Sequence, residues 1–244
     1  MVTIDSKIRK ADDLYGLIED GDEIAVGLSG GKDSTVLLWA LAKLREYCGK
    51  EFGIIGITVD PGFLGRKGDY SKLSSFCTSL GIKHVIKEDS LYDVVFEKRR
   101  ESNPCSLCAR MRRGSLNRCA KENGCNKVAL GHHMDDVAAT FWMNFKNEGR
   151  IATFSPSTYL DRIGITVIRP MILCREREVI HAAHELDVPV IESLCPVNGK
   201  TERASVSKLM SDDLGFLGDD AVQKTFEAIQ RSGISGYGIT ESRK

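Results

Sequence analysis

The sequence lacks an excess of charge of either sign. Its 244 residues carry 34 Lys and Arg against 34 Asp and Glu. This balance excludes a uniformly basic nucleic-acid-binding protein, so any polyanion would have to bind a local patch. No uninterrupted apolar segment reaches the roughly 18 residues that span a bilayer, and residues 1–7 lack the apolar core of a signal peptide. We therefore expect a cytoplasmic protein without membrane contact.

Internal repeats, low-complexity linkers and a clear domain boundary are also missing. The length fits one large α/β domain with a small appendage, so we assign residues 1–210 to the main domain. Residues 211–244 are expected to form a helical C-terminal tail with a partly disordered end. The eight cysteines of a cytoplasmic chain are not expected to form disulfides, and their spacing has to separate metal ligands from core residues.

One stretch, residues 24–38, dominates what is present. An apolar run rich in β-forming residues stops at Ser29-Gly30-Gly31, and residues with helical spacing follow, which predicts a strand, a tight turn and a helix. Adjacent glycines let backbone N–H groups approach an anion, the helix N-terminus adds a positive dipole, and Lys32 adds a charge. We interpret this turn as a phosphate-binding loop, with an ordinary Gly-rich turn as the alternative.

This loop differs from the P-loop of kinases and GTPases. Val26 stands where that pattern needs a glycine, and Asp33 follows the lysine in place of Ser or Thr. The string Ser29 to Ser34 is similar to the loop of the ATP pyrophosphatase superfamily, which binds the leaving pyrophosphate and uses ATP to adenylate a substrate. The resemblance implies that ATP is the ligand.

The remaining apolar runs predict an α/β fold with an open, mainly parallel sheet and helices on both faces. Strands are expected at 24–28, 52–60, 83–87, 127–130, 165–170 and 188–191. Helices are expected within 3–20, 36–44, 72–80, 92–98, 137–144, 176–186, 205–210 and 221–230, with 232–238 as a poorly ordered end.

Polar side chains stand where predicted strands end, which is where such sheets bind nucleotides. Asp60 is either a nucleotide contact or only a turn residue. Asp135 and Asp136 follow a strand that ends in Gly131-His132-His133, and they either hold Mg²⁺ or a nucleotide or cap the next helix. Arg169 ends another strand as a candidate phosphate contact.

Residues 98–121 form a basic island, in which eight Lys and Arg face one acid. Such a run is either a solvated helix face or a patch for a polyanion. Inside it, Pro104 suits a first helical turn, and the i, i+3 spacing of Cys105 and Cys108 puts both thiols on one face. Nearby guanidinium groups favour thiolates, so this is a redox pair, half of a zinc or cluster site, or a coincidence.

A second Cys-x-x-Cys is missing, so nothing completes a zinc ribbon. A third cysteine, Cys195, lies in a loop-like segment from which a ligand could turn inward. Three thiolates would leave one corner of a tetrahedral metal site, or one iron of a cubane cluster, open for chemistry. The other cysteines and three histidines lie in helix or strand patterns and are expected to be structural: Cys48, Cys77, Cys119, Cys125, Cys174, His84, His181 and His184.

Five motifs in this order resemble those of the tRNA 2-thiocytidine synthetase family: Ser29–Ser34, Cys105–Gly114, Gly131–Asp136, Ile168–Pro170 and Cys195. The resemblance covers about Ile24 to Met210. Members of this family are iron–sulfur-dependent ATP pyrophosphatases that replace the C2 oxygen of a cytidine in the tRNA anticodon loop with sulfur. Two departures, Ala139 in place of a usual Glu and Glu148-Gly149-Arg150 in place of a Gly-Gly-Lys turn, concern the surface around the substrate more than the chemistry.

The resemblance implies that Cys105, Cys108 and Cys195 ligate a [4Fe-4S] cluster whose fourth iron is free for sulfide. It also implies ATP on the loop and Mg²⁺ held by Asp33 or by Asp135 and Asp136. The nucleotide is expected to contact Leu28, Ser29, Gly30, Gly31, Lys32, Asp33, Ser34, Val59, Asp60, Gly131, His132 and Arg169.

In the implied reaction the C2 oxygen of the base attacks the α-phosphate of ATP, and pyrophosphate leaves. Sulfide then attacks C2, and AMP leaves. The expected catalytic residues are Lys32, Asp33, Asp135, Asp136 and Arg112, the last of which lies one helical turn beyond the cysteine pair and would face both cluster and phosphate. The rest of the basic island would bind the tRNA backbone.

The implied partners are the tRNA anticodon loop and a sulfur donor, such as a cysteine desulfurase or inorganic sulfide, and a homodimer is left open. Two rival functions remain at this point. One is an ATP-dependent ligase of the same superfamily, or a thiolase for another nucleoside. The other is a nucleotide-binding redox sensor that uses Cys105 and Cys108, although a switch needs no third ligand such as Cys195.

Overall fold

A six-stranded sheet with the order β3-β2-β1-β4-β6-β5 forms the centre of the fold. The computed structural model describes residues 3–89, 91–92, 95, 104–191, 206 and 220–238. All neighbouring strands pair in parallel except β5, which is antiparallel to β6. The predicted open, mainly parallel sheet is confirmed. The strands are β1 (Asp22–Gly27), β2 (Phe52–Asp60), β3 (Lys83–Glu88), β4 (Lys127–Ala129), β5 (Ser157–Leu160) and β6 (Ile165–Ile168).

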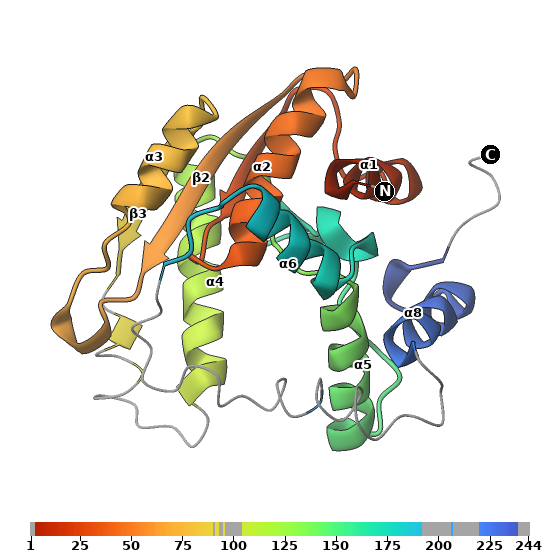
Figure 1. Cartoon of the computed structure of the whole chain (residues 1–244). Helices are drawn as coiled ribbons and strands as arrows, with labels where there is room; N and C mark the ends of the chain where they lie inside the picture. Colours follow the sequence, from red (N-terminus) through yellow and green to blue (C-terminus); the bar gives the residue numbers. More distant parts are fainter. Residues whose placement is uncertain are drawn as a thin grey trace.

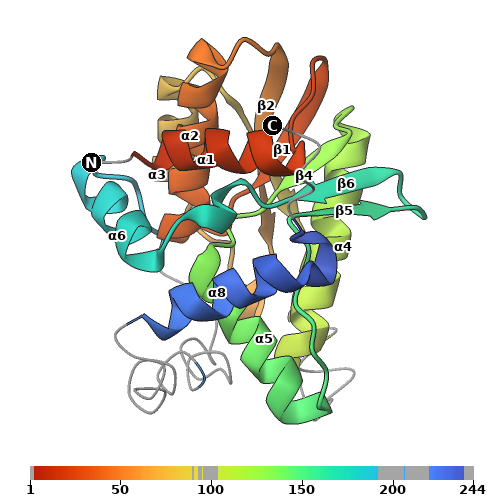
Figure 2. The same cartoon turned by 90° about the vertical axis from the view of Figure 1, so that its right-hand side faces the viewer.

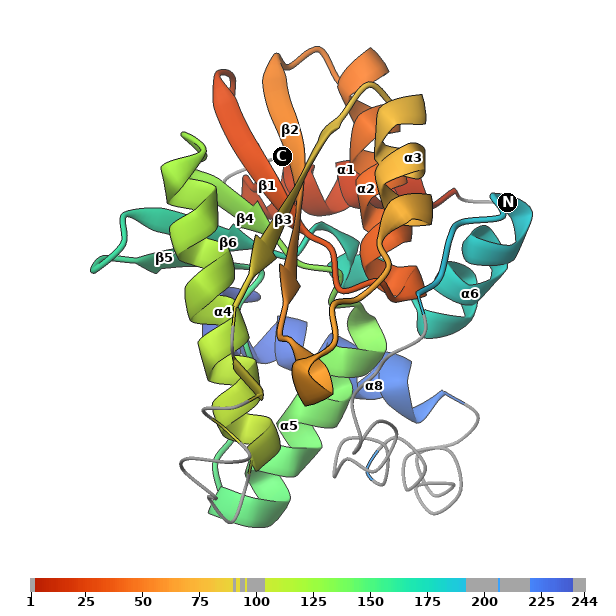
Figure 3. The same cartoon turned by 90° about the vertical axis from the view of Figure 1, so that its left-hand side faces the viewer.

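Helices cover both faces of this sheet, as predicted (Figure 3). The α-helices are α1 (Ile4–Tyr15), α2 (Lys32–Tyr47), α3 (Ser71–Ser79), α4 (Pro104–Glu122), α5 (Met134–Glu148), α6 (Glu176–Glu185) and α8 (Ala221–Ser232). Three short 3₁₀ turns are η1 (Phe63–Gly65), η3 (Pro170–Leu173) and η5 (Ile234–Gly236). Among the described residues, no helix is long and apolar enough to cross a membrane.

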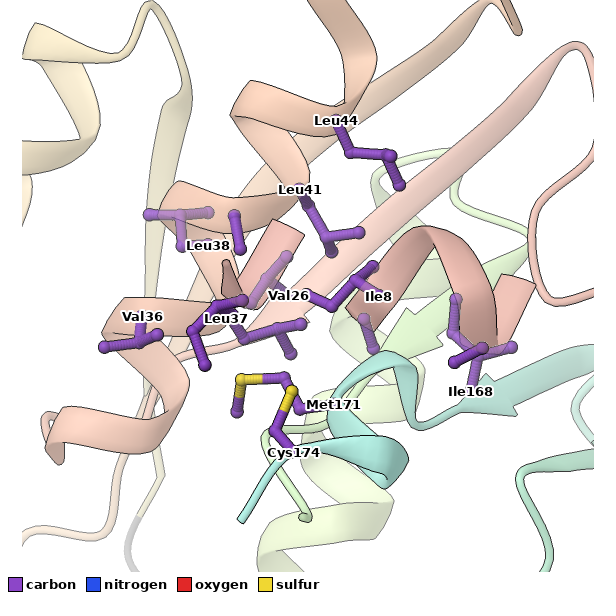
Figure 4. Packing of buried hydrophobic residues seen from close by; sticks show 14 of the residues in the cluster. Ile8, Val26, Val36, Leu37, Leu38, Leu41, Leu44, Ile168, Met171 and Cys174 are labelled. Atoms are coloured by element: carbon purple, nitrogen blue, oxygen red, sulfur yellow. The ribbon is translucent and has the colours of Figure 1, made fainter. Parts of the chain in front are cut away.

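The two faces of the sheet are buried in separate hydrophobic clusters because successive strand residues point to opposite sides. In β1, Ile24 and Val26 join α1, α2 and α6 on one side, whereas Ala25 joins α4 on the other. Figure 4 shows side chains of α1, β1, α2 and η3 meeting in the larger cluster. Each fully buried aliphatic side chain there contributes about 1.5–3 kcal/mol to folding, so the position of α2 beside β1 is firmly fixed.

The topology reverses between β1 and β4, which are neighbours in the sheet although the chain reaches β2 and β3 between them. The loops after β1 and β4 therefore lie at a switch point, where parallel α/β sheets bind ligands. Both α2 and α5 begin there, and α4 begins well beyond the carboxyl ends of the strands (Figures 1 and 3). Three predicted motifs thus belong to the same edge of the sheet.

The structure differs from the expected elements at two strands. Residues 188–191 form no strand, because they lie against the phosphate-binding loop and not beside the sheet: the Ile191 N–H donates to the Gly30 carbonyl at 2.8 Å. Conversely, β5 was not expected. Its four residues Ser157–Leu160 are polar or partly exposed and pair only with β6, so they carry little periodic signal.

The C-terminal part of the described chain is better packed than expected. Residues 232–238 were predicted to be poorly ordered, but Tyr237 is fully buried and makes edge-to-face contacts with Tyr15 of α1 and Phe226 of α8. Helix α8 lies against α5, where the Trp142 indole N–H donates to the Thr225 hydroxyl at 3.2 Å (Figure 2). This part of the tail belongs to the main core.

Some predictions fall outside the described residues. They include most of the helices expected at 92–98 and 205–210, the domain boundary at residue 210, and Cys195. The helix predicted within 3–20 is shorter than that range, because Gly16 takes a left-handed conformation and ends α1 after Tyr15.

Candidate active site

The loop between β1 and α2 is closed by hydrogen bonds among its own residues. The Ser34 hydroxyl donates to the Gly31 carbonyl at 2.9 Å and lies 3.2 Å from the Ser29 N–H, which donates to it. Gly30 has φ +82°, a conformation that favours glycine, and a Cβ there would lie 2.9 Å from the Ile191 Cβ. The predicted phosphate-binding turn is therefore preformed at the N-terminus of α2.

Gly131 brings the second motif against this loop. A Cβ on Gly131 would lie 3.0 Å from the backbone carbonyl carbon and oxygen of Asp33 and 3.1 Å from the Ser34 nitrogen. Only a residue without a side chain lets the end of β4 approach the first turn of α2 so closely. The two motifs that are about 100 residues apart in the sequence share one site for this steric reason.

Lys32 lies between two carboxylates. Its Nζ is 3.1 Å from Asp33 Oδ1 and 3.2 Å from Glu176 Oε1 at the start of α6. Burial acts to lower the pKa of Lys32, but the charges of Asp33 and Glu176 outweigh it and the pKa is raised. The lysine is therefore a cation held by two carboxylates at the mouth of the loop, and its positive charge agrees with the prediction from the sequence.

Asp135 is already engaged by the start of α6. Its Oδ2 accepts the Glu176 backbone N–H at 2.7 Å and lies 3.4 Å from Arg175 Nε and 3.6 Å from His133 Nδ1. Burial alone would raise the pKa of Asp135, but the His133 ring, the Glu176 N–H and Arg175 lower it to about 2. Asp135 is thus an anionic anchor for α6.

Asp136 caps its own helix, since its Oδ2 accepts the His133 backbone N–H at 3.0 Å. The His133 ring is buried, with Nε2 3.6 Å from Asp136 Oδ2. Burial acts to lower the pKa of His133, but the carboxylates of Asp135, Asp136 and Asp33 outweigh it, so the pKa is higher than that of an ordinary histidine. The capping interpretation of the paired acids is therefore correct for Asp136, and the cap orders the residues that face the loop.

Asp60 is held by the turn that follows β2. Its two carboxylate oxygens accept the backbone N–H groups of Gly62 at 3.0 Å and Gly68 at 2.8 Å. The Leu28 side chain is buried under β2, and its N–H donates to the Ile57 carbonyl at 2.8 Å. The turn interpretation of Asp60 is thus correct in this state, and nucleotide contacts of Leu28, Val59 and Asp60 stay predictions.

Arg169 is buried at the end of β6, with only 9 % of its surface exposed. Its Nη1 donates to the Ser155 carbonyl at 2.6 Å, and its guanidinium carbon lies 4.9 Å from the centre of the Phe154 ring, which His132 also contacts. Burial, together with the charge of Arg113 in α4 and against the effect of Tyr237, lowers the pKa of Arg169 to about 10. A contact of Arg169 or His132 with the nucleotide stays a prediction.

Cys105 and Cys108 lie in the first two turns of α4, and neither forms a disulfide. Cys108 is buried beside Leu107 and Met111, and Cys105 is half-buried. Arg112 follows one turn later and is exposed. Burial and the charge of Asp60 raise the pKa of Tyr70 to about 12, and the charge of Arg112 opposes this rise. The Arg112 guanidinium therefore lies close enough to the segment between β2 and α3 to interact electrostatically with Tyr70. The predicted helix-borne cysteine pair is confirmed, and Cys195 is not described.

The model of the PP-loop domain family matches residues 3–203. A protein of Geobacter sulfurreducens named tRNA-cytidine(32) 2-sulfurtransferase is 37 % identical over 232 residues, which cover 94 % of this chain and 86 % of the relative. The chain belongs to the tRNA-cytidine(32) 2-sulfurtransferase family. Another relative of that name, from Cupriavidus necator, is 37 % identical over 86 % of this chain and 67 % of its own length.

Solved structures agree with this family. The U34-tRNA thiolase NcsA from Methanococcus maripaludis, determined with its [4Fe-4S] cluster, has a TM-score of 0.74 and 26 % identity and covers 94 % of this chain and 78 % of that one. The NH₃-dependent NAD synthetase from Campylobacter jejuni has a TM-score of 0.51 at 15 % identity over 96 % and 94 % of the two chains. The second similarity shows only a shared fold, which is the predicted PP-loop type.

The cysteines fit an iron–sulfur cluster, whereas the acids offer few protein ligands for Mg²⁺. Cys105 and Cys108 share one helix face, Cys108 packs beside Leu107 and Met111, and exposed arginines follow on the same helix, which suits thiolate ligands of iron. In the described part of the chain, no three His, Cys, Asp or Glu residues are arranged to hold a metal. Asp33 Oδ1 is buried and faces the loop beside its ion-pair partner Lys32, so it is the acid best suited to meet Mg²⁺ that ATP brings.

Arg175 and Glu176 connect the two motifs, although neither residue was expected in the site from the sequence. They directly follow Cys174 and open a predicted helix, where an acid has an ordinary role near the helix dipole. Because this ordinary role accounts for an acid at a helix start, the sequence gives no sign that Glu176 contacts Lys32. Only the packing of α6 on α2 brings the two residues together.

Proposed function

We propose that this protein is an ATP-dependent tRNA sulfurtransferase that converts a cytidine of the anticodon loop to 2-thiocytidine. The observation that carries the proposal is that a preformed phosphate-binding loop and a cysteine pair on one helix face belong to one edge of the sheet in a chain of this family. The relatives' name specifies cytidine 32 of tRNA, and we extend that position to this protein. A tRNA substrate implies a cytoplasmic activity.

The loop residues carry the first half of the reaction. Backbone N–H groups at the start of α2 and the Lys32 ammonium bind the β- and γ-phosphates of ATP, and Asp33 holds Mg²⁺. The C2 oxygen of the base attacks the α-phosphorus, and the bond to the bridging oxygen breaks with its electron pair leaving on pyrophosphate. The fixed positive charges stabilise the leaving group as its charge develops.

The second half replaces oxygen by sulfur. When bound, a [4Fe-4S] cluster on Cys105, Cys108 and Cys195 supplies an open iron that carries the sulfur. Sulfide attacks C2, and the C2–O bond breaks with AMP as the leaving group, so no electrons are gained or lost overall. Arg112 is exposed on the same helix one turn from Cys108 and neutralises negative charge on the adenylate during this exchange.

The exposed arginines of α4 bind the tRNA backbone in this proposal. Arg110, Arg112, Arg113 and Arg118 are all exposed, and none of them forms an ion pair with another described residue. Inorganic sulfide donates the sulfur directly, or a cysteine desulfurase supplies it as a persulfide that a thiol reductant converts to sulfide. Light scattering of the purified chain tests whether it forms a homodimer.

The test uses anaerobically purified protein with unmodified tRNA, ATP, Mg²⁺ and sulfide, followed by mass spectrometry of the nucleosides. We expect 2-thiocytidine together with AMP and pyrophosphate, and about four irons per chain. Cys105→Ala and Cys195→Ala should lose iron and thiolation but still release pyrophosphate, whereas Lys32→Ala should lose both steps. Cys48→Ala, at the far end of α2, is the matched control.

Two results would contradict the proposal. Zinc in place of iron, with pyrophosphate release that depends on a small molecule and not on tRNA, would support a ligase of the same superfamily. Failure to release pyrophosphate with any RNA would support a nucleotide sensor.

A further inference from the structure

The first turn of α6 joins the two sequence motifs of the site through one residue. Glu176 Oε1 lies 3.2 Å from Lys32 Nζ of the phosphate-binding loop, while the Glu176 backbone N–H donates to Asp135 Oδ2 at 2.7 Å. We propose that Glu176 is a positioning residue, which holds the Lys32 ammonium at the mouth of the loop before ATP binds. This inference rests on the proposed role of the loop in binding ATP.

The backbone of Glu176 is fixed, whereas Lys32 is not. Arg175 forms an ion pair with Asp220 at 2.5 Å, and the Arg175 backbone N–H donates to the Glu178 carboxylate of its own helix at 2.7 Å. Together with Asp135, these contacts fix the first turn of α6 from three sides. Lys32 has a flexible four-carbon stem, so its ammonium is located only by what it binds.

Holding the ammonium in place benefits the binding of a phosphate. A lysine that is already ordered loses less rotamer freedom when a ligand arrives. The Glu176 carboxylate opposes this gain by repelling phosphate, but 46 % of its side chain is exposed, so water screens the repulsion. Ordering therefore outweighs repulsion, and Glu176 should strengthen the binding of ATP.

Asp33 and Glu176 have different roles at the same ammonium. Asp33 is the residue next to Lys32 in α2, so it pairs with the ammonium within a single helix. Glu176 comes from another element and binds only one position of the side chain. When a phosphate arrives, the ammonium keeps this position and binds the phosphate from it, while Glu176 continues to hold it.

The experiment measures the dissociation constant of ATP with Mg²⁺ by calorimetry, on the full chain without tRNA. Glu176→Ala should weaken binding by about 5–10-fold, and Glu176→Gln by only about 2–3-fold, because its amide oxygen still accepts from Lys32. In the sulfur-transfer assay the KM for ATP should rise while kcat changes by less than about 2-fold. Glu185→Gln, an exposed ion-pair partner of His181 at the other end of α6, should change neither value.

A double-mutant cycle separates positioning from a structural effect. In a Lys32→Ala background, Glu176→Ala should have no further effect, because no ammonium remains to be held. An equal loss in both backgrounds would overturn the inference, as would tighter or unchanged binding by Glu176→Ala when Lys32→Ala alone binds weakly. Wild-type protein that binds no ATP, or binds it as well after Lys32→Ala, would overturn the proposed function of the loop and the inference with it.

Discussion

Asp135 has its carboxylate committed to the architecture of the site. It accepts the first N–H of α6 and faces Arg175 and His133, which together hold its pKa at about 2 although burial acts to raise it. The paired acids after β4 were expected to hold Mg²⁺ or a nucleotide. Asp135 positions the helix that carries Glu176 to Lys32, and its contact with Mg²⁺ or a nucleotide stays a prediction. A carboxylate near a nucleotide site can thus act by positioning another element of the site.

Replacing Asp135 by Asn tests this role through the pH dependence of stability. A carboxyl group whose pKa is lower in the folded chain stabilises it above the unfolded pKa, near 4, and loses this contribution as the pH falls toward 2. Asp135→Asn should lower the free energy of unfolding by about 2 kcal/mol at pH 7. This difference should fall to about half by pH 3, which urea unfolding at several pH values measures.

Arg175→Gln is the matched variant for this measurement. It removes one of the groups that lower the pKa of Asp135 and leaves the Glu176 N–H and His133 in place. It should therefore retain part of the acid dependence. A difference between wild type and Asp135→Asn that stays the same from pH 7 to pH 3 would show that Asp135 is not an ionised anchor.

At the scale of elements, α4 carries two of the predicted features along one helix. Its first turns carry Cys105 and Cys108, and its exposed face carries the arginines that the sequence marks as a basic island. The other face, with Leu116 and Ala120, packs on the sheet. Because this packing fixes α4 on the sheet, it also fixes the positions of the charged face and the cysteine pair relative to the loop after β1.

Replacing Arg112, Arg113 and Arg118 together by Ala tests the charged face. The affinity for tRNA should fall, and the slope of log K against log salt should become shallower by up to about 2–3, since each lost phosphate contact removes about 0.7–0.9. Filter binding at several salt concentrations measures both quantities.

The control replaces two exposed cations of α1, Arg9 and Lys10, by Ala. It changes the net charge by a similar amount but removes no charge from α4, so its salt slope should stay close to that of the wild type. Equal slopes for both variants would show that α4 has no special role in binding tRNA.

At the scale of the whole molecule, the C-terminal segment closes the main core. Tyr237 packs between Tyr15 of α1 and Phe226 of α8, and the Ser235 hydroxyl accepts the Thr153 N–H at 3.1 Å. These contacts join the last described residues to the first helix and to the segment before β5. The described tail is therefore part of the unit that positions the site.

Tyr237→Ala should lower the free energy of unfolding by about 3–5 kcal/mol, because it leaves a large cavity. The corresponding fall in Tm is roughly 10 °C. Tyr237→Phe should be nearly neutral, since the hydroxyl is buried without a hydrogen-bond partner among the described residues. Calorimetry or thermal circular dichroism compares the variants, and a mild effect of Tyr237→Ala would mean that the tail is dispensable.

Local chemistry explains which parts of the fold and the site could be read from the sequence. The turn at Gly30, the helix after it and the cysteine pair of α4 depend on residues that are close in the chain, so their patterns predict them well. The short β5 and the coil at 188–191 depend on which neighbour each segment meets, and no local pattern contains that information. The same reason explains why the poorly ordered end expected at 232–238 was wrong for Tyr237.

The sequence by itself determined the class of the sheet, the phosphate-binding loop, the position of the cysteines and the family, because each follows from short motifs and hydrophobic periodicity. The tertiary structure alone decided how the acids are used. Asp135 anchors α6, Asp136 caps α5, Asp60 holds a turn, and Glu176 reaches Lys32. A carboxylate has the same chemistry wherever it stands, and only the donors that packing brings within about 3 Å decide its role.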